Sequence, residues 1–89
     1  MPRLELTARA QHELDELRGG DFERVVAAIQ GLKENPRPQG VKKLRGPIYR
    51  IRVGDWRVIY AVFDKDGLVI VGKVARRGKH TYEGVEERF

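Results

Sequence analysis

The chain has 89 residues, a net charge of +5 and an isoelectric point near 9.9, and it contains neither cysteine nor serine. This length fits one domain over residues 1–89, and the missing residue types exclude disulfides, thiolate nucleophiles and a Ser-His-Asp hydrolase. Two histidines are too few for a His-only zinc site, so we expect no metal and no cofactor. No apolar run approaches about 18 residues and no signal-peptide pattern is present, so we expect a soluble, cytoplasmic protein with no membrane contact.

The first 35 residues predict a strand followed by two helices. Residues 3–6 alternate apolar and charged side chains, as a short strand does. Apolar residues at helical spacing predict a helix over about 8–18, capped by Thr7 and ended by two glycines. A second helix is expected to start with Asp21 as its cap and to stop before the proline at position 36. The short connection predicts an antiparallel helical hairpin.

The rest of the chain is dominated by patterns of period two. Residues 36–47 hold three prolines and two glycines and are expected to form a loop. Three strands are then predicted by β-branched and aromatic residues at Ile48–Val53, Trp56–Phe63 and Leu68–Val74. The order β-α-α-β-β-β indicates an α+β fold in which the helical hairpin packs on a small antiparallel twisted sheet. Residues 82–89 are compatible with a short C-terminal helix.

Turn lengths decide which side chains share a face of this sheet. A two-residue turn at Gly54-Asp55 makes one face of the first two long strands apolar, with Trp56 and Tyr60 in the core. The other face then carries Arg50, Arg52 and Arg57. A three-residue loop is expected before the third strand, because a longer one would bury Lys73 in the core. That register places Leu68, Ile70 and Val74 on the apolar face and Arg77 among the arginines.

Basic residues are concentrated in one block. Residues 36–57 hold seven basic side chains and a single acid, Asp55. Because like charges repel, such a block favours either a surface for a polyanion or solubility alone. The forked guanidinium of arginine matches phosphate geometry, so we favour a nucleic-acid backbone over a merely solvated face.

Several segments of the sequence resemble a known protein family. Residues 43–46, 49–60 and 74–77 with Tyr82 are similar to the RelE/ParE superfamily, the toxic halves of type II toxin–antitoxin pairs in bacteria and archaea. The resemblance spans nearly the whole chain and implies the same α+β fold and a cognate antitoxin protein. In that superfamily, RelE-like members cleave mRNA without a metal, commonly in the ribosomal A site formed by 16S rRNA. ParE-like members instead bind DNA gyrase and lack the nuclease residues.

The resemblance also implies site residues, by position. Those expected to act at the scissile phosphate are Arg50, Arg52, Arg57, Arg77 and Tyr82. The clustering of charge, and not the resemblance, supplies the residues expected to hold the RNA: Lys42, Lys43 and Arg45 in the basic block, and Arg76 and Lys79 in a second basic cluster with Arg77. Because the positions implied by the resemblance keep suitable chemistry, the ribonuclease (mRNA interferase) interpretation is favoured. A gyrase inhibitor and an RNA-binding module without activity remain the alternatives.

The proton-transfer group is left open. The best-known members have lysines where Arg50 and Arg52 stand, and arginine does not release its proton at physiological pH. His80 is the expected substitute because histidine titrates near neutrality. Lys79 and Tyr82 compete for the role, and proton transfer by the ribosome is a further alternative. The sequence does not indicate an oligomeric state.

Overall fold

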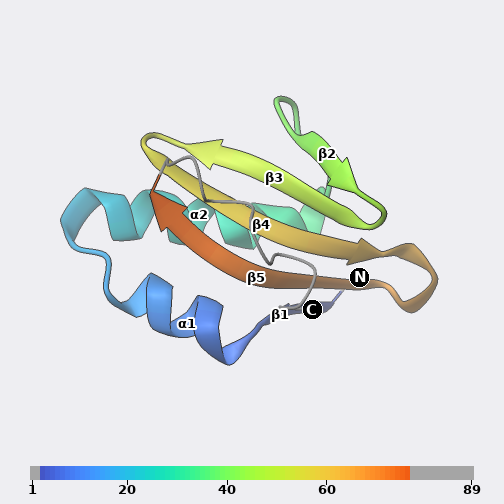
Figure 1. Ribbon diagram of the computed structural model, residues 1–89, viewed down its shortest axis with the longest axis horizontal. Coiled ribbons are helices and arrows are strands. Elements are labelled where there is room, and N and C mark those ends of the chain that lie inside the picture. The colour runs from blue at the N-terminus through green and yellow to red at the C-terminus, as the bar shows by residue number, and fades with distance from the viewer. Residues whose placement is uncertain (1–2, 77–89) are drawn as a thin grey trace.

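Five strands make one sheet and two helices cover one of its faces in the computed structural model, which describes residues 3–76 (Figure 1). No helix in this described range is long and apolar enough to cross a membrane. In chain order the elements are β1 (Arg3–Leu6), α1 (Ala8–Asp15), α2 (Gly19–Glu34), β2 (Lys42–Arg45), β3 (Ile48–Val53), β4 (Trp56–Phe63), the 3-10 turn η1 (Asp64–Asp66) and β5 (Leu68–Arg76). The α+β class and the helical hairpin are confirmed.

The sheet has one more strand than predicted, and its strands are not all antiparallel. Its order is β1-β5-β4-β3-β2, with β1 parallel to β5 and the other neighbours antiparallel. The additional strand, β2, lies inside the segment predicted as a loop. Three of its four residues are charged, so it carries no apolar alternation. It is a strand because it pairs with β3.

The hairpin differs from the prediction in where the helices meet. Thr7 caps α1 as predicted, since its hydroxyl accepts a hydrogen bond from the backbone N–H of Ala10 at 3.1 Å. However, α1 ends at Asp15, and α2 begins at Gly19 with a positive φ of 55°. Asp21 is therefore inside the first turn and is not the cap. A carboxylate there still faces the positive end of the helix dipole.

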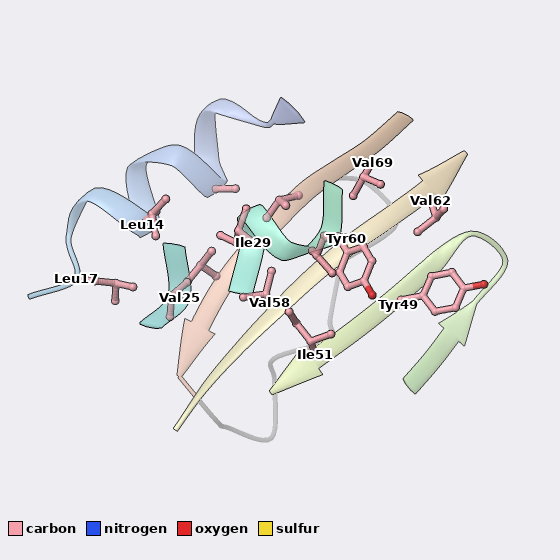
Figure 2. Packing of buried hydrophobic residues seen from close by; sticks show 14 residues of the cluster. Leu14, Leu17, Val25, Ile29, Tyr49, Ile51, Val58, Tyr60, Val62 and Val69 are labelled. Atoms are coloured by element: carbon pink, nitrogen blue, oxygen red, sulfur yellow. The ribbon is translucent and has the colours of Figure 1, made fainter. Parts of the chain in front are cut away.

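The predicted register of β3 and β4 is confirmed. Gly54 adopts a positive φ of 60° in the two-residue turn, and Val53 pairs with Trp56 across it. Alternation then sends one side of both strands toward the helices, where Tyr60 is fully buried and Trp56 packs against the core. Figure 2 shows this core, which joins α1, α2 and the sheet through Leu14, Leu17, Val25, Ile29, Tyr49, Ile51, Val58, Tyr60, Val62 and Val69.

The register predicted for the start of β5 is wrong. Phe63 pairs with Leu68, so the loop has four residues and contains η1. Val69 and Val71 consequently enter the core, with exposed fractions of 1% and 0%, in place of Leu68 and Ile70. The sequence analysis excluded a four-residue loop because, in a regular strand, that register would place Lys73 in the core.

A β-bulge removes that objection. Tyr60 of β4 pairs with Val71, and the next residue of β4, Ile59, pairs with Lys73. Gly72 is therefore an extra residue of β5 without a register partner in β4. A bulge shifts the alternation of the residues that follow it. Val74 therefore returns to the core as predicted, and Lys73 lies on the face away from the helices.

The loop after α2 is tied to the sheet by two tyrosines. The Arg37 guanidinium donates to both carboxylate oxygens of Asp64, at 3.2 and 2.8 Å, and its Nε donates to the Tyr49 hydroxyl at 3.0 Å. The Tyr60 hydroxyl donates to the Pro36 carbonyl oxygen at 2.6 Å, and the two tyrosine rings stack with centroids 5.9 Å apart. These contacts fix the loop that leads into β2.

Tyr60→Phe is expected to lower the free energy of unfolding by about 1 kcal/mol at neutral pH, because the Pro36 carbonyl loses its donor. Burial raises the pKa of Tyr60, with a further contribution from Tyr49. The folded state therefore holds this proton more tightly than the unfolded state, and its stabilising effect is lost as pH rises above about 10. Urea unfolding at pH 7, 10 and 11 should show a shallower alkaline loss of stability in Tyr60→Phe. Equal slopes in both proteins would contradict this assignment.

Candidate nucleic-acid interface

The sheet face opposite the helices is cationic, and we call it the basic face. It is defined by side chains that alternate with core residues on β3 and β4 and by their register partners on β2 and β5: Lys42, Arg50, Arg52, Arg57 and Lys73. The prediction that Arg50, Arg52 and Arg57 share a face is confirmed. Their chemical roles remain predictions.

The register places these residues in two neighbouring rows. One row crosses four strands and consists of Lys42, Arg50, Ile59 and Lys73. The next consists of Arg52, Arg57 and Ala75. Adjacent strands are about 4.8 Å apart, so the cations are near neighbours. Arg52 and Arg57 are directly opposed, an arrangement that costs stability.

Three of the cations are nearly buried. The exposed fractions are 8% for Arg50, 7% for Arg57 and 8% for Lys73, whereas Arg52 and Lys42 are exposed. Lysine and arginine are rarely buried to this extent unless an anion compensates them. The Nε of Arg57 is buried and has no hydrogen-bond partner among residues 3–76. A donor left in this state costs about 1–3 kcal/mol, so the geometry favours an incoming acceptor.

An apolar cluster lies beside the cations. Ile48 and Ile59 are buried on the basic face, and Leu44 of β2 packs against them. This cluster lowers the local dielectric constant and so strengthens the attraction between the cations and a bound anion. Across residues 3–76 no group of three or more side chains could hold a metal ion. The basic face offers hydrogen-bond donors, which suit phosphate.

The remaining predicted RNA contacts divide between the two sides of the sheet. Arg45 pairs with Ile48 at the edge of the basic face. Lys43 pairs with Tyr49, a core residue, and Arg76 pairs with Trp56, with its guanidinium 4.8 Å from the centre of the Trp56 ring. Lys43 and Arg76 therefore do not belong to the basic face.

The other predicted site residues, Arg77, Lys79, His80 and Tyr82, lie outside the described residues, as does the predicted C-terminal helix.

Lys73 is the residue that the sequence interpretation missed. It was treated as a side chain to be kept out of the core, in a strand assumed to be regular. The signal available was Gly72, because a glycine inside a strand pattern often marks a bulge. With a bulge at that position, Lys73 lies on the same face of the sheet as the three arginines.

Comparison with known proteins identifies the family. A family model described as the ParE toxin of the type II toxin–antitoxin system parDE matches residues 4–80. The chain therefore belongs to this toxin family, within the RelE/ParE superfamily.

Named relatives are toxins of the RelE type. A Methanocaldococcus jannaschii protein named as toxin RelE1 is 33% identical over 79 residues, which cover 83% of this chain and 88% of that protein. The structure of the archaeal RelE–RelB complex from Pyrococcus horikoshii matches with a TM-score of 0.79 at 30% identity, covering 88% of this chain and 97% of that one. A mutant of E. coli RelE in the free state matches with a TM-score of 0.77 at 26% identity, covering 97% and 95%. The two-helix, five-strand architecture is thus shared with RelE structures.

Proposed function

We propose that this toxin is a metal-independent endoribonuclease that cleaves mRNA in the ribosomal A site and so inhibits translation in the cytoplasm. The observation that carries the proposal is the set of three nearly buried cations, Arg50, Arg57 and Lys73, in adjacent strands of one face. A surface that concentrates positive charge attracts a polyanion. RNA supplies negative charge at regular spacing.

The chemistry that this site suits is attack by a ribose 2′-hydroxyl on its own 3′-phosphate. The 2′-oxygen forms a bond to phosphorus, and the bond from phosphorus to the 5′-oxygen of the next nucleotide breaks. The products are a 2′,3′-cyclic phosphate and a free 5′-hydroxyl. The protein contributes by positioning the phosphate and by stabilising the negative charge that accumulates on it. Guanidinium groups suit that task because they donate from fixed directions.

Arg57 is the residue best placed to contact the phosphate. It comes from β4, an internal strand of the sheet, and its Nε is a buried donor without an acceptor among the described residues. Arg50 and Arg52 flank it from β3. The roles of Arg77 and Tyr82 at the phosphate, and of Lys79 and His80 nearby, are part of the proposal through the family resemblance alone.

A cognate antitoxin is the proposed protein partner. The structural relatives from Pyrococcus horikoshii and E. coli include RelE in complex with RelB. The E. coli complex matches this chain with a TM-score of 0.75 at 26% identity. We infer that a partner of the same kind neutralises this toxin by covering its surface.

Primer extension on mRNA with the purified protein tests the proposal. Cuts spaced by codons, found with ribosomes and absent without them, are the expected result. Product ends carrying 2′,3′-cyclic phosphate and 5′-hydroxyl groups would establish the reaction described above. Intact mRNA under both conditions would overturn the proposal.

The second candidate function is inhibition of DNA gyrase, and the name of the matching family model favours it. It does not by itself account for the concentration of basic side chains on one face of the sheet. A supercoiling assay separates the two. Inhibited supercoiling together with intact mRNA would favour the gyrase inhibitor.

A further inference from the structure

A pocket opens where α2, the loop after it and the outer edge of β3 meet. β2 pairs with β3 only from Ile48 to Arg50, so β3 from Ile51 onward has no strand on its outer side among residues 3–76 (Figure 1). This edge pocket has a volume of about 510 Å³. It is lined by Ala28 and Gly31 of α2, Pro38 and Gln39 of the loop, and Ile51 and Arg52 of β3. Sites for small ligands typically have about 300–1,000 Å³ and apolar walls with a few polar groups, as this one does.

Gly31 keeps the edge pocket open, although the fold does not need a glycine at this position. It lies inside α2, where glycine is the least favourable residue after proline. Its φ is not positive, and a Cβ built there would meet no atom within 4 Å beyond its own helix backbone. Neither backbone geometry nor packing therefore requires the glycine. A larger side chain would project into the pocket, so an occupant of the pocket accounts for the choice of residue.

Arg52 connects the edge pocket to the basic face. It is an exposed cation of that face and also lines the pocket. A phosphate bound beside Arg52 therefore brings its attached base to the mouth of the pocket. The positive charge attracts RNA and disfavours a second copy of this chain, which would bring like charge to the same edge. Proteins read the splayed bases of single-stranded RNA by stacking, guanidinium planes included, and by hydrogen bonds to the base edges.

We propose that the edge pocket binds one base of the mRNA beside the scissile phosphate, an inference that rests on the proposed function. Ala28, Pro38 and Ile51 offer apolar surface to the faces of the base. Gln39 is exposed at the pocket, and its amide carries both donors and an acceptor. Such an amide forms paired hydrogen bonds with the edge of a base, adenine in particular. Gln39 is therefore the residue that selects the base.

A ribosome-bound mRNA pool that is randomised around the A-site codon tests this assignment, with the cut ends sequenced. The wild type is expected to prefer one base at one position near the cut by about 10-fold, the discrimination that one paired set of hydrogen bonds provides. Gly31→Leu fills the pocket and Gln39→Ala removes the amide. Both should cleave the preferred sequences as slowly as the others, which abolishes the preference at that position.

Matched controls change the same residue types elsewhere in α2. Gly20→Leu and Gln30→Ala lie at exposed positions that do not line the pocket, and both should keep the wild-type preference. Thermal melting accompanies each variant. Gly31→Leu should melt no lower than the wild type, because leucine favours a helix more than glycine does. If Gly31→Leu does not fold, Gly31→Ala and Gln39→Ala carry the same test.

Each other outcome overturns the inference. An unchanged preference in folded Gly31→Leu and Gln39→Ala would remove the pocket from base recognition. If the same variants also bind the co-expressed antitoxin more weakly, the pocket belongs to that protein partner. Equal slowing on every sequence would assign the pocket to a contact with ribosomal RNA. In these cases, and if the wild type cleaves with no base preference, the proposed function stands. A wild-type protein that leaves every mRNA intact overturns both.

Discussion

Arg57→Ala is expected to reduce mRNA cleavage by about 100- to 1000-fold, the range seen when one preorganised donor to a developing oxyanion is removed. The size follows from where the side chain lies. Arg57 is 7% exposed, on an internal strand, with a buried Nε that lacks a partner in residues 3–76. A donor held away from water needs no reorganisation when charge develops on the phosphate. Single-turnover cleavage of a ribosome-bound mRNA measures the loss.

Two further variants make that result specific. Arg57→Lys keeps the charge but not the fork of donors, and we expect it to recover only part of the activity. Arg24→Ala removes an exposed arginine of α2 that pairs with Asp21, and it should cleave at the wild-type rate. If Arg57→Ala folds and cleaves as fast as the wild type, Arg57 has no part in the reaction.

The part of the site formed by β3 and β4 could be predicted because a local feature fixes it. A two-residue turn with glycine at its first position leaves one register, and strict alternation then sorts every side chain of both strands. Arg50, Arg52 and Arg57 follow from that turn alone. No contact between distant parts of the chain was needed to place them.

The features that were missed depend on contacts far apart in the sequence. β2 is a charged segment that becomes a strand by pairing with β3. β1 runs parallel to its neighbour β5, which lies more than sixty residues later in the chain. The bulge at Gly72 is held by Thr7 and Glu13, also about sixty residues away. Local propensity contains no signal for such partners, so alternation along β5 was applied in the wrong phase.

The position of Arg76 shows a second limit of prediction from the sequence. It was assigned to the RNA surface because basic residues cluster near the end of the last strand. Its register partner is Trp56, and its guanidinium stacks on that ring on the helix side of the sheet. Sequence clustering of charge therefore does not establish a common face, whereas strand register does.

Arg52→Glu is expected to stabilise the protein and to inactivate it. Arg52 is directly opposite Arg57, and like charges so placed are destabilising. A glutamate there forms a cross-strand pair of opposite charge, worth about 0.5–1 kcal/mol at an exposed position. For a domain of this size that corresponds to a rise in melting temperature of about 2–8 °C. The same carboxylate repels the phosphate and occupies Arg57, so cleavage should fall by about 100-fold or more.

Arg52→Gln separates the two effects. It removes the repulsion without adding a carboxylate, so both its melting temperature and its cleavage rate should lie between those of the wild type and Arg52→Glu. The gain in melting temperature should shrink in about 1 M salt, because Arg52 is exposed and salt screens its interaction with Arg57. A lower melting temperature in Arg52→Glu, or undiminished cleavage, would contradict the opposed-arginine account. A higher melting temperature together with slower cleavage in Arg52→Glu would mean that the opposed arginines cost the sheet stability and are needed for the reaction.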